Sequence, residues 1–416
     1  MKRLDWFIAR RYLSSRRKGR FLSLITVIAV GGICLGVTAL ITVIAVMTGL
    51  QRDLQGKILG NNPHIFVFEP GQSFRLEHYE GLLRSVREVP GVVAAAPLVM
   101  TQVGLVKENG EYAQAGQLWG IDPDAEGPPL TVVQERIRSG EYSLGPTQTG
   151  LPGILVGRRL ADKMSLMPGD IVTIISGENI KTGPLGELRP ATEQFEVTGR
   201  FETGMYDYDS QFIYAPIAAV QDLLDLPANT VSGLAVNVVD PWRADAVAVA
   251  VEDALGFPYF TQSWIELNAT LFSALKLEKL ALFVILSLII LVAAFNIVST
   301  LVMVVKDKTK EIGILKSMGL TDARVLRVFL LQGLAIGLVG TALGTVGGLT
   351  LVWLLDRYKF ITLPGDVYFV DTLPVALDPV DLLLIVCVSI LIALLATVHP
   401  ARQASRLQPV EAIRHE

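Results

Sequence analysis

The stretch that decides the fold is FLSLITVIAVGGICLGVTALITVIAVMTGLQ, residues 21–51, which contains no charged side chain over 31 residues. A helix needs about 20 apolar residues to cross a bilayer, whereas the apolar core of a secretory signal has only about 7–15. A basic segment precedes the stretch, as it would in a signal, but no small-residue cleavage site follows within reach. We therefore predict an uncleaved membrane-spanning helix.

Three further runs lack charged residues: 280–305, 328–355 and 382–398. The last has only 17 residues, which is the short limit for a span. Asp378 can cap its helix and Pro379 suits the first helical position, which adds nearly a turn, and Pro400 is expected to mark the exit. The chain is 51% hydrophobic and 18% charged, below the roughly 25% charge of soluble domains. The sequence thus predicts four spans.

Charge on the connecting segments predicts the orientation, because cytoplasmic segments carry the excess of Lys and Arg. Residues 1–20 contain eight basic residues and one acidic residue, and residues 306–327 contain six basic and three acidic residues. Residues 51–279 contain 17 basic and 29 acidic residues, and residues 356–381 contain two basic and five acidic residues. We therefore predict that both termini and the segment 306–327 are cytoplasmic, whereas the long segment and the loop 356–381 are extracytoplasmic.

The predicted division of the chain follows from these two patterns. It comprises a cytoplasmic basic or interfacial helix at 1–20, spans at 21–50, 276–305, 324–355 and 379–399, an extracytoplasmic domain at 51–275, a cytoplasmic helix at 306–323, an extracytoplasmic loop at 356–378 and a cytoplasmic tail at 400–416.

The long extracytoplasmic segment alternates turn residues with short β-like runs, at 64–68, 153–157, 170–175, 194–198 and 211–214. Helical patterns lie between them, at 76–89, 158–164 and 217–226. This alternation predicts an α+β domain with two lobes, one formed by 64–120 with 228–262 and the other by 131–225. The predicted fold is an α-helical membrane protein with four transmembrane helices and a two-lobed α+β extracytoplasmic domain.

The connection 176–190 inside this domain contains two prolines and three glycines. It is long for a hairpin, where two to five residues are typical. Leu185 and Leu188 near its tip are expected to be apolar and exposed, which favours partner binding. A plain flexible loop is the alternative that the composition leaves open.

No catalytic motif stands out in the sequence. His64 and His78 have no partners at metal-ligand spacing, and neither a phosphate-binding loop nor a Gly-x-Ser-x-Gly nucleophile motif occurs. Asp207 and Asp209 lack the flanking acids of a calcium loop, so we interpret them as a solvated turn. We predict no enzymatic activity, no metal, no cofactor and no nucleic-acid partner.

The four runs also lack ionisable residues, which argues against an ion-coupled transporter. Asn296 lies mid-span, where an interhelical hydrogen bond is the favoured interpretation and a substrate path the alternative. Glycines recur at four-residue spacing, which lets helices approach closely. We expect these glycines to pack a bundle that assembles with another copy or a homologue: Gly32, Gly36, Gly340, Gly344 and Gly348.

The segment KDKTKEIGILKSMGLTDARVLR, residues 306–327, predicts a short cytoplasmic helix that Thr309 caps and Gly319 ends. Apolar residues alternate on it with charged ones; they are Ile312, Ile314, Leu315 and Met318, with Lys310, Glu311 and Lys316 around them. An apolar patch on a short helix between spans needs a partner or the membrane surface.

Residues 310–321, KEIGILKSMGLT, resemble the coupling-helix signature of the permeases grouped with MacB and FtsX. The layout of one span, a large outer domain and three spans resembles that group as well. Within it, the chain is most similar to lipoprotein-releasing permeases of the LolC/LolE type, through four stretches: 43–55, 204–209, 295–301 and 399–414.

The resemblance implies the permease subunit of an ATP-driven ABC transporter in the bacterial inner membrane. Such a transporter extracts triacylated, outer-membrane-directed lipoproteins and hands them to a periplasmic carrier. The implied partners are two copies of a cytoplasmic ATPase, which binds the ATP, and a second permease, either a homologue or another copy. LolC-like, LolE-like and single-permease roles all stay open.

The resemblance also assigns candidate residues. The ATPase-coupling helix comprises Lys310, Glu311, Ile312, Gly313, Ile314, Leu315, Lys316, Met318 and Gly319. The carrier-binding hook comprises Pro184, Leu185, Gly186, Leu188 and Pro190. The candidates for the acyl-chain cavity rest on the residues themselves: Met47 because Met is adaptable and apolar, and Asn296 because it is polar and lies mid-span. Two other functions stay open: an FtsX-like signalling module that regulates periplasmic cell-wall hydrolases, and a MacB-like exporter, although that type carries its ATPase in the same chain.

Overall fold

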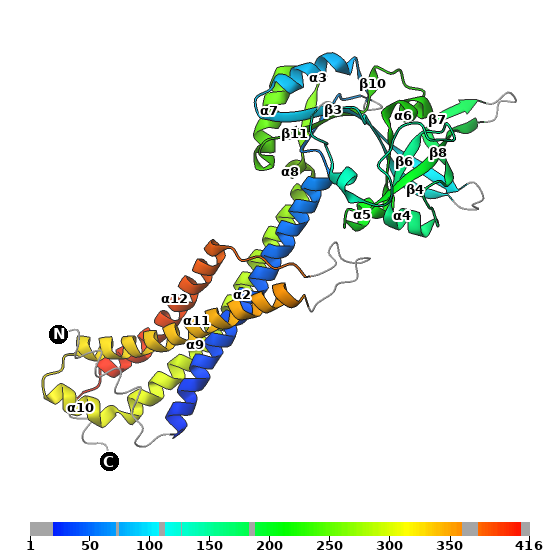
Figure 1. Ribbon diagram of the computed structural model, residues 1–416. Coiled ribbons are helices and arrows are strands. Elements are labelled where there is room, and N and C mark those ends of the chain that lie inside the picture. The colour runs from blue at the N-terminus through cyan, green and yellow to red at the C-terminus, as the bar shows by residue number, and fades with distance from the viewer. Residues whose placement is uncertain are drawn as a thin grey trace. The chain divides into compact units, whose positions relative to one another are not determined.

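The computed structural model describes residues 20–71, 75–107, 113–125, 127–182, 188–359 and 373–408. The chain divides into two compact units, drawn in Figure 1. One consists of long helices and is called the helical unit below. The other, from Asp53 to Ser273, is called the outer domain.

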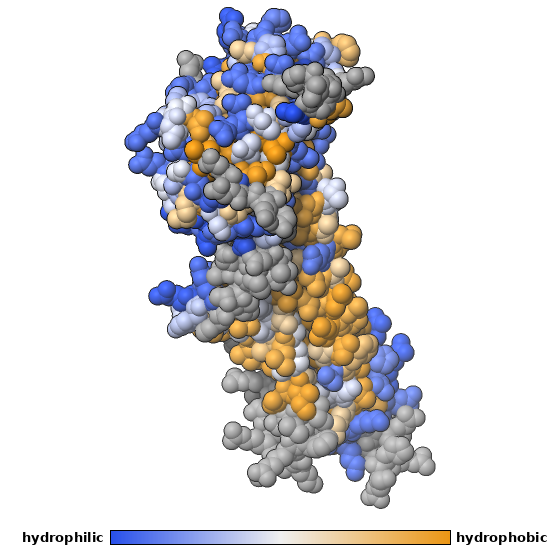
Figure 2. Space-filling model, turned by 90° about the vertical axis from the view of Figure 1, so that its right-hand side faces the viewer, coloured by the Kyte–Doolittle hydropathy of each residue, from blue (hydrophilic) through white to orange (hydrophobic). Residues whose placement is uncertain are grey.

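Among the described residues, four helices are long and apolar enough to cross a membrane, which confirms the four predicted spans. The long helices are α2 (Arg20–Asn61), α9 (Ala269–Asp307), α11 (Asp322–Tyr358) and α12 (Pro379–Ser405), with the short helix α10 (Thr309–Ser317) between α9 and α11; residues 53–61 of α2 and 269–273 of α9 belong to the outer domain. Figure 2 shows apolar side chains gathered on the outer surface of the helical unit. Val284, Leu288 and Phe295 of α9 are among the exposed ones, as expected for a surface that meets lipid or another membrane helix.

Several helix boundaries differ from the prediction: α9 already begins at Ala269 instead of 276, and α10 ends at Ser317 instead of 323. Helix α2 continues beyond residue 50 to Asn61, where Leu54 and Ile58 are buried and Ile58 packs in the core of the outer domain. Helix α12 runs through Pro400, so the prediction that this proline ends it is wrong. Ala401 and Ala404 beyond the proline are fully buried in the core of the helical unit, and this packing outweighs the lost backbone hydrogen bond.

The helix caps are partly as predicted. The Asp378 carboxylate accepts a hydrogen bond from Val380 N at 2.9 Å, with Pro379 in the first turn of α12. Thr309 does not cap α10, because its hydroxyl donates to the Val305 and Lys306 carbonyls of the preceding helix. Gly319 follows the end of α10 with φ +99°, the left-handed conformation that glycine adopts without strain.

The five glycines expected to pack helices lie at contacts within this chain. Gly32 and Gly36 of α2 face Ala293 and Ile290 of α9. Gly340, Gly344 and Gly348 of α11 face α2, at Ile33, at Cys34 with Val37, and at Ile41, respectively. The repeats are therefore occupied inside one bundle, and the expected contact with another copy is not needed to explain them.

Replacing Gly344 by Ala is expected to destabilise the helical unit. A Cβ at this position would lie 2.7 Å from the Cys34 carbonyl oxygen, which is backbone and cannot rotate away. Helices α2 and α11 must separate, at a cost of about 1–3 kcal/mol. Thermal unfolding of the detergent-solubilised chain measures this. Gly31→Ala is the control, since a Cβ there meets nothing within 4 Å; equal unfolding temperatures for the two variants would contradict the packing argument.

The outer domain is built on a ten-stranded sheet in the order β12-β1-β11-β3-β4-β9-β6-β8-β5, with β7 paired to both β3 and β8. Its strands are β1 (Ile65–Phe68), β3 (Val92–Lys107), β4 (Gln114–Ile121), β5 (Ile137–Gly140), β6 (Gly153–Gly157), β7 (Ile171–Thr182), β8 (Leu188–Phe201), β9 (Phe212–Pro216), β11 (Gly233–Val238) and β12 (Phe260–Ser263). The short strands β2 (Leu76–Glu77) and β10 (Thr230–Val231) pair separately.

Pairing of β7 with two strands closes part of this sheet on itself. The cycle β3-β4-β9-β6-β8-β7 returns to β3, so six strands form a closed ring. Strand β3 belongs to both halves, because residues 92–98 pair with β11 and residues 103–107 with β7. The two halves therefore belong to one sheet, whose buried side chains form two hydrophobic clusters, and the division into two lobes stays a prediction.

Short helices cover the sheet: α3 (Tyr79–Glu88), α4 (Arg158–Lys163), α5 (Tyr206–Gln211), α6 (Ile217–Leu224), α7 (Ala244–Leu255) and α8 (Trp264–Leu267), with 3-10 turns η1 (Val132–Arg136) and η2 (Pro241–Arg243). The helix predicted over 76–89 begins only at Tyr79, because Leu76 and Glu77 pair with β10 instead.

Candidate functional site

Helix α10 lies against the end of the helical unit where α12 finishes. Lys316 fixes it there, since its Nζ donates to the carbonyl oxygens of Ser405 at 2.8 Å and Leu407 at 2.7 Å. The same ammonium lies 2.8 Å from Asp322 Oδ1 at the start of α11. Lys316 thereby satisfies the free carbonyls of a helix end and joins three helices.

The predicted coupling residues divide between the inner and outer faces of α10. Ile312 and Gly313 are buried, and Ile312 packs in the core of the helical unit. Ile314 is 50% exposed and Met318 is 79% exposed, four residues apart and hence on one face. Lys310, Glu311 and Gly319 are exposed as well, and Leu315 is half-buried. The helix thus presents an apolar surface, defined here as Ile314 with Met318, on a rigid support.

Part of the connection 176–190, which the sequence predicts to lie between two strands, belongs to those strands instead. Strand β7 reaches Thr182 and β8 begins at Leu188, as the projecting hairpin in Figure 1 shows. Pro184, Leu185 and Gly186 lie outside the described residues. Ile180 pairs with Pro190 and Thr182 with Leu188, so Ile180, Leu188 and Pro190 share one face of the hairpin. All three are exposed, and this face is called the hook face below.

Met47 and Asn296, the candidate acyl-chain residues, differ in their surroundings. Met47 is buried in the helical unit. Asn296 is exposed on α9, beside Phe295. Its backbone carbonyl accepts from the Thr300 hydroxyl at 2.6 Å, but within the described residues no hydrogen bond includes its side chain. Among the residues that the structure describes, Asn296 therefore does not make the interhelical hydrogen bond expected of it.

A charged cluster that the sequence analysis missed lies where α2, α9 and α12 meet. Lys279 Nζ lies 2.6 Å from Asp381 Oδ2, which also accepts from the Thr48 hydroxyl at 3.2 Å. Arg52 pairs with Asp378 at 3.3 Å. Lys279 and Asp381 directly flank two of the apolar runs, and their opposite charges could have suggested the pair. The cluster ties three spans together at one end.

Asp209 is not part of a solvated turn, so that interpretation is wrong. It is only 3% exposed, and its Oδ1 accepts from Thr203 N at 2.7 Å and from the Thr203 hydroxyl at 2.8 Å. Its Oδ2 accepts from Gly204 N at 3.2 Å. Burial raises the pKa of Asp209 above its ordinary value of 3.8, while these hydrogen bonds act in the opposite direction. The side chain holds together the turn that enters α5.

Replacing Asp209 by Ala is expected to destabilise the outer domain by about 1–3 kcal/mol, because buried donors of Thr203 lose their acceptor. A folded-state pKa above the unfolded value means that the contribution of the carboxyl to stability is greatest at low pH and declines as pH rises through the raised pKa. The difference in stability between wild type and variant should therefore be larger at pH 4 than at pH 7. Unfolding curves at both values test this, with the exposed neighbour Asp207 replaced by Ala as the control.

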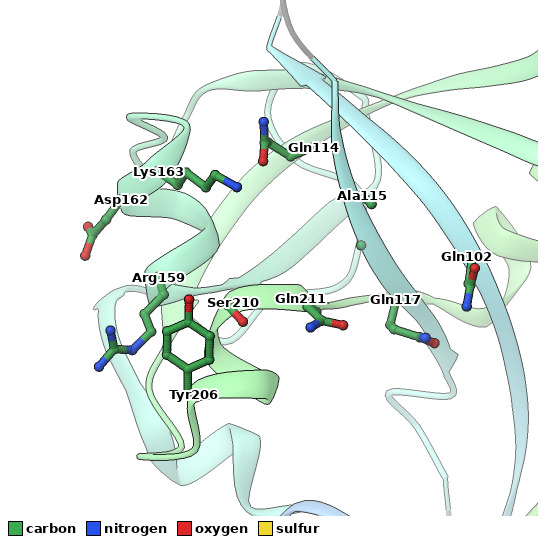
Figure 3. Close-up of a pocket in the computed structure, with 11 residues that line it drawn as sticks. Gln102, Gln114, Ala115, Gln117, Arg159, Asp162, Lys163, Tyr206, Ser210 and Gln211 are labelled. Atoms are coloured by element: carbon green, nitrogen blue, oxygen red, sulfur yellow. The ribbon is translucent and has the colours of Figure 1, made fainter. Parts of the chain in front are cut away.

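A cavity of about 830 Å³ in the outer domain lies beside α4 and α5 (Figure 3). Glutamines of β3 and β4 line it, with Arg159, Lys163 and Tyr206. Lys163 extends toward Gln114, whereas Asp162 points away. The Arg159 guanidinium lies 5.0 Å from the centroid of the Tyr206 ring. In the part of the chain that the structure describes, no group of three His, Cys, Asp or Glu side chains could hold a metal ion.

Family comparisons agree with this architecture. Residues 26–254 match the MacB-like periplasmic core domain, and residues 283–409 match the FtsX-like permease C-terminal domain. The periplasmic region of MacB from Actinobacillus actinomycetemcomitans aligns at 12% identity over 52% of this chain and 94% of that chain, with a TM-score of 0.34. The two domain matches, the four spans and the outer α+β domain define a permease of the MacB/FtsX-like group.

Relatives that align with the chain over its full length identify a narrower family within this group of permeases. The chain is 36% identical to the lipoprotein-releasing system transmembrane protein LolC of Neisseria meningitidis, over 99% of both chains. It is 34% identical to LolC of Xylella fastidiosa over 98% of both, and 28% identical to LolE of Haemophilus influenzae over 98% of both. The chain belongs to the LolC/LolE family of lipoprotein-releasing system transmembrane proteins.

Proposed function

We propose that this chain is the permease subunit of an ATP-driven ABC transporter that extracts outer-membrane-directed lipoproteins from the bacterial inner membrane and passes them to a periplasmic carrier. The observation that carries the proposal is the apolar surface of α10, Ile314 with Met318, on a helix fixed between α9, α11 and α12. Full-length relatives named for lipoprotein release support it.

Energetics explain why such a permease needs an ATPase. Burial of each acyl CH₂ is worth about 0.8 kcal/mol, so extraction of three acyl chains from a bilayer is steeply unfavourable. The chain has no phosphate-binding loop of its own. Two copies of a separate ATPase, docked on α10 of this permease and of a second one, would supply the energy. ATP and its magnesium then belong to that partner.

The proposed orientation places both termini and α10 in the cytoplasm and the outer domain in the periplasm, following the distribution of Lys and Arg. Exposed apolar side chains on α9 provide a surface for the second permease or for lipid. The hook face, formed by Ile180, Leu188 and Pro190, would receive the soluble carrier.

Purification of the chain with its native neighbours tests the proposal. An ATPase should co-purify, and the complex in proteoliposomes should release a triacylated lipoprotein only when ATP and a soluble carrier are both present. Absence of any associated ATPase, or release without nucleotide, would overturn the proposed function.

A further inference from the structure

The hook hairpin leaves the outer domain at a bulge of unusual size. Ser176 of β7 pairs with Ala191 of β8, but the next paired residues are Ile180 and Pro190. Three residues, Gly177 to Asn179, therefore have no partner on β8, whereas an ordinary bulge adds one. Ser176 is also the last β7 residue that pairs with β3. Beyond it, sheet pairing alone would leave the hairpin free to swing about the bulge.

The bulge is anchored on one side by the carboxylate of Glu178. Its Oε2 accepts from Arg75 Nη2 and its Oε1 from the Thr101 hydroxyl, both at 2.6 Å. Charge-assisted hydrogen bonds of this kind are among the stronger ones. The Glu178 carboxylate is thus held by Arg75 and Thr101, which come from separate parts of the outer domain.

These donors are themselves fixed. Thr101 lies on β3 and is buried. Arg75 also donates to the Ser232 hydroxyl at 2.9 Å, and that oxygen accepts from Met100 N at 2.9 Å. Ser232 is buried, so the network ends in the rigid part of the sheet. The position of Glu178 is therefore tied to β3 and to the residue that precedes β11.

A second anchor acts on the other side of the bulge. Asn179 Nδ2 donates to the Leu223 carbonyl of α6 at 3.1 Å, and Glu178 N donates to the Ser176 hydroxyl at 3.2 Å. Consecutive side chains, Glu178 and Asn179, thus hold the bulge from two directions. A hairpin anchored at two points keeps one angle to the domain that carries it.

We infer that Glu178, with its donors Arg75 and Thr101, is a positioning residue that holds the hook face at a fixed angle for docking of the carrier. The inference rests on the proposed function, because it assumes that a soluble protein with an apolar patch binds Ile180, Leu188 and Pro190. A hairpin held in its binding orientation loses less conformational freedom on docking, and this raises affinity without any contact between Glu178 and the partner.

Hook orientation can be measured without any partner. In the full-length chain with Cys34 and Cys387 replaced by Ala, spin labels at Leu188 on the hook and at Val93 on β3 report one distance distribution by pulsed electron resonance. Glu178→Ala should broaden it, and Glu178→Gln, which keeps an acceptor oxygen, should broaden it less. Glu202→Ala is the matched control, since it removes another ion-paired carboxylate, with Arg138 and Arg158, and should leave the distribution unchanged.

Binding of a purified soluble periplasmic lipoprotein carrier from the same organism to the unlabelled permease complex completes the test. Glu178→Ala should raise the dissociation constant about tenfold, Glu178→Gln by less, and Glu202→Ala not at all. Unchanged distances in Glu178→Ala, or broadened distances with unchanged affinity, would overturn the positioning role. If wild type itself binds no carrier, the proposed function fails instead, and the distance measurement still decides whether Glu178 holds the hook.

Discussion

Replacing Ile314 by Asp is expected to detach the ATPase from the purified permease while the chain stays folded. Ile314 is half exposed on α10, and a carboxylate there would be buried without a partner in an apolar interface. Loss of a central apolar contact costs about 2 kcal/mol, which lowers affinity about 30-fold. Co-purification of the ATPase and ATP-dependent lipoprotein release measure the effect.

The folded state of this variant follows from the contacts of α10. Ile312 and Lys316, which hold the helix to the bundle, are unchanged. Val249→Asp is the matched control, because Val249 is an exposed apolar residue on a helix of the outer domain, 61% accessible. It should retain the ATPase in full. Retention of the ATPase by the Ile314→Asp variant would contradict the proposal that the ATPase docks on α10.

Replacing Leu188 by Asp is expected to block transfer of lipoprotein to the carrier while ATP hydrolysis continues. Leu188 is 72% exposed and shares the hook face with Ile180 and Pro190. A charge at an apolar contact of this size should weaken carrier binding at least about tenfold. Direct binding of carrier to the permease complex and the yield of released lipoprotein both report on it.

Val239→Asp serves as the control for this second prediction. Val239 is 75% exposed in the same domain, so the two substitutions introduce the same charge at equally exposed apolar positions. Normal carrier binding by Leu188→Asp would show that the hook face is not the docking surface. An equal loss in both variants would point to a general effect of charge on the outer domain.

The sequence predicts the four candidate membrane helices because lipid imposes a simple rule. Charged residues are excluded from a span, so their absence marks each helix, and Asp378 with Pro379 marks the start of α12 correctly. The end of α12 was missed because a proline predicts a break only where nothing else holds the helix. Ala401 and Ala404 are buried, and their packing keeps the helix intact beyond Pro400. A local sequence pattern does not show such tertiary packing.

Other features depend on contacts between distant residues. Glycine spacing indicates a close approach of helices, but only the fold shows that Gly344 meets Cys34 of the same chain. The carboxylate of Asp209 can be buried because Thr203 N and Gly204 N donate to it. The spacing of the two carboxylates in the sequence does not show these contacts and so predicts that Asp209 is exposed to solvent. The hook was noticed by its composition, whereas its anchor at Glu178 depends on Arg75, about a hundred residues earlier in the chain.

The shared strand β3 has a consequence for how this protein is made. Residues 92–107 need partners from β7 at 172–176 and from β11 at 233–238, and β1 needs β12 at 260–263. Strand pairings between residues so distant along the chain form slowly, because the entropy cost of closing long loops comes before the stabilising contacts form. The ring cannot close until β7 and β8 have been translocated, and the sheet is complete only just before α9 begins. Exposed strand edges persist throughout that interval, which leaves the outer domain open to misassembly during biogenesis.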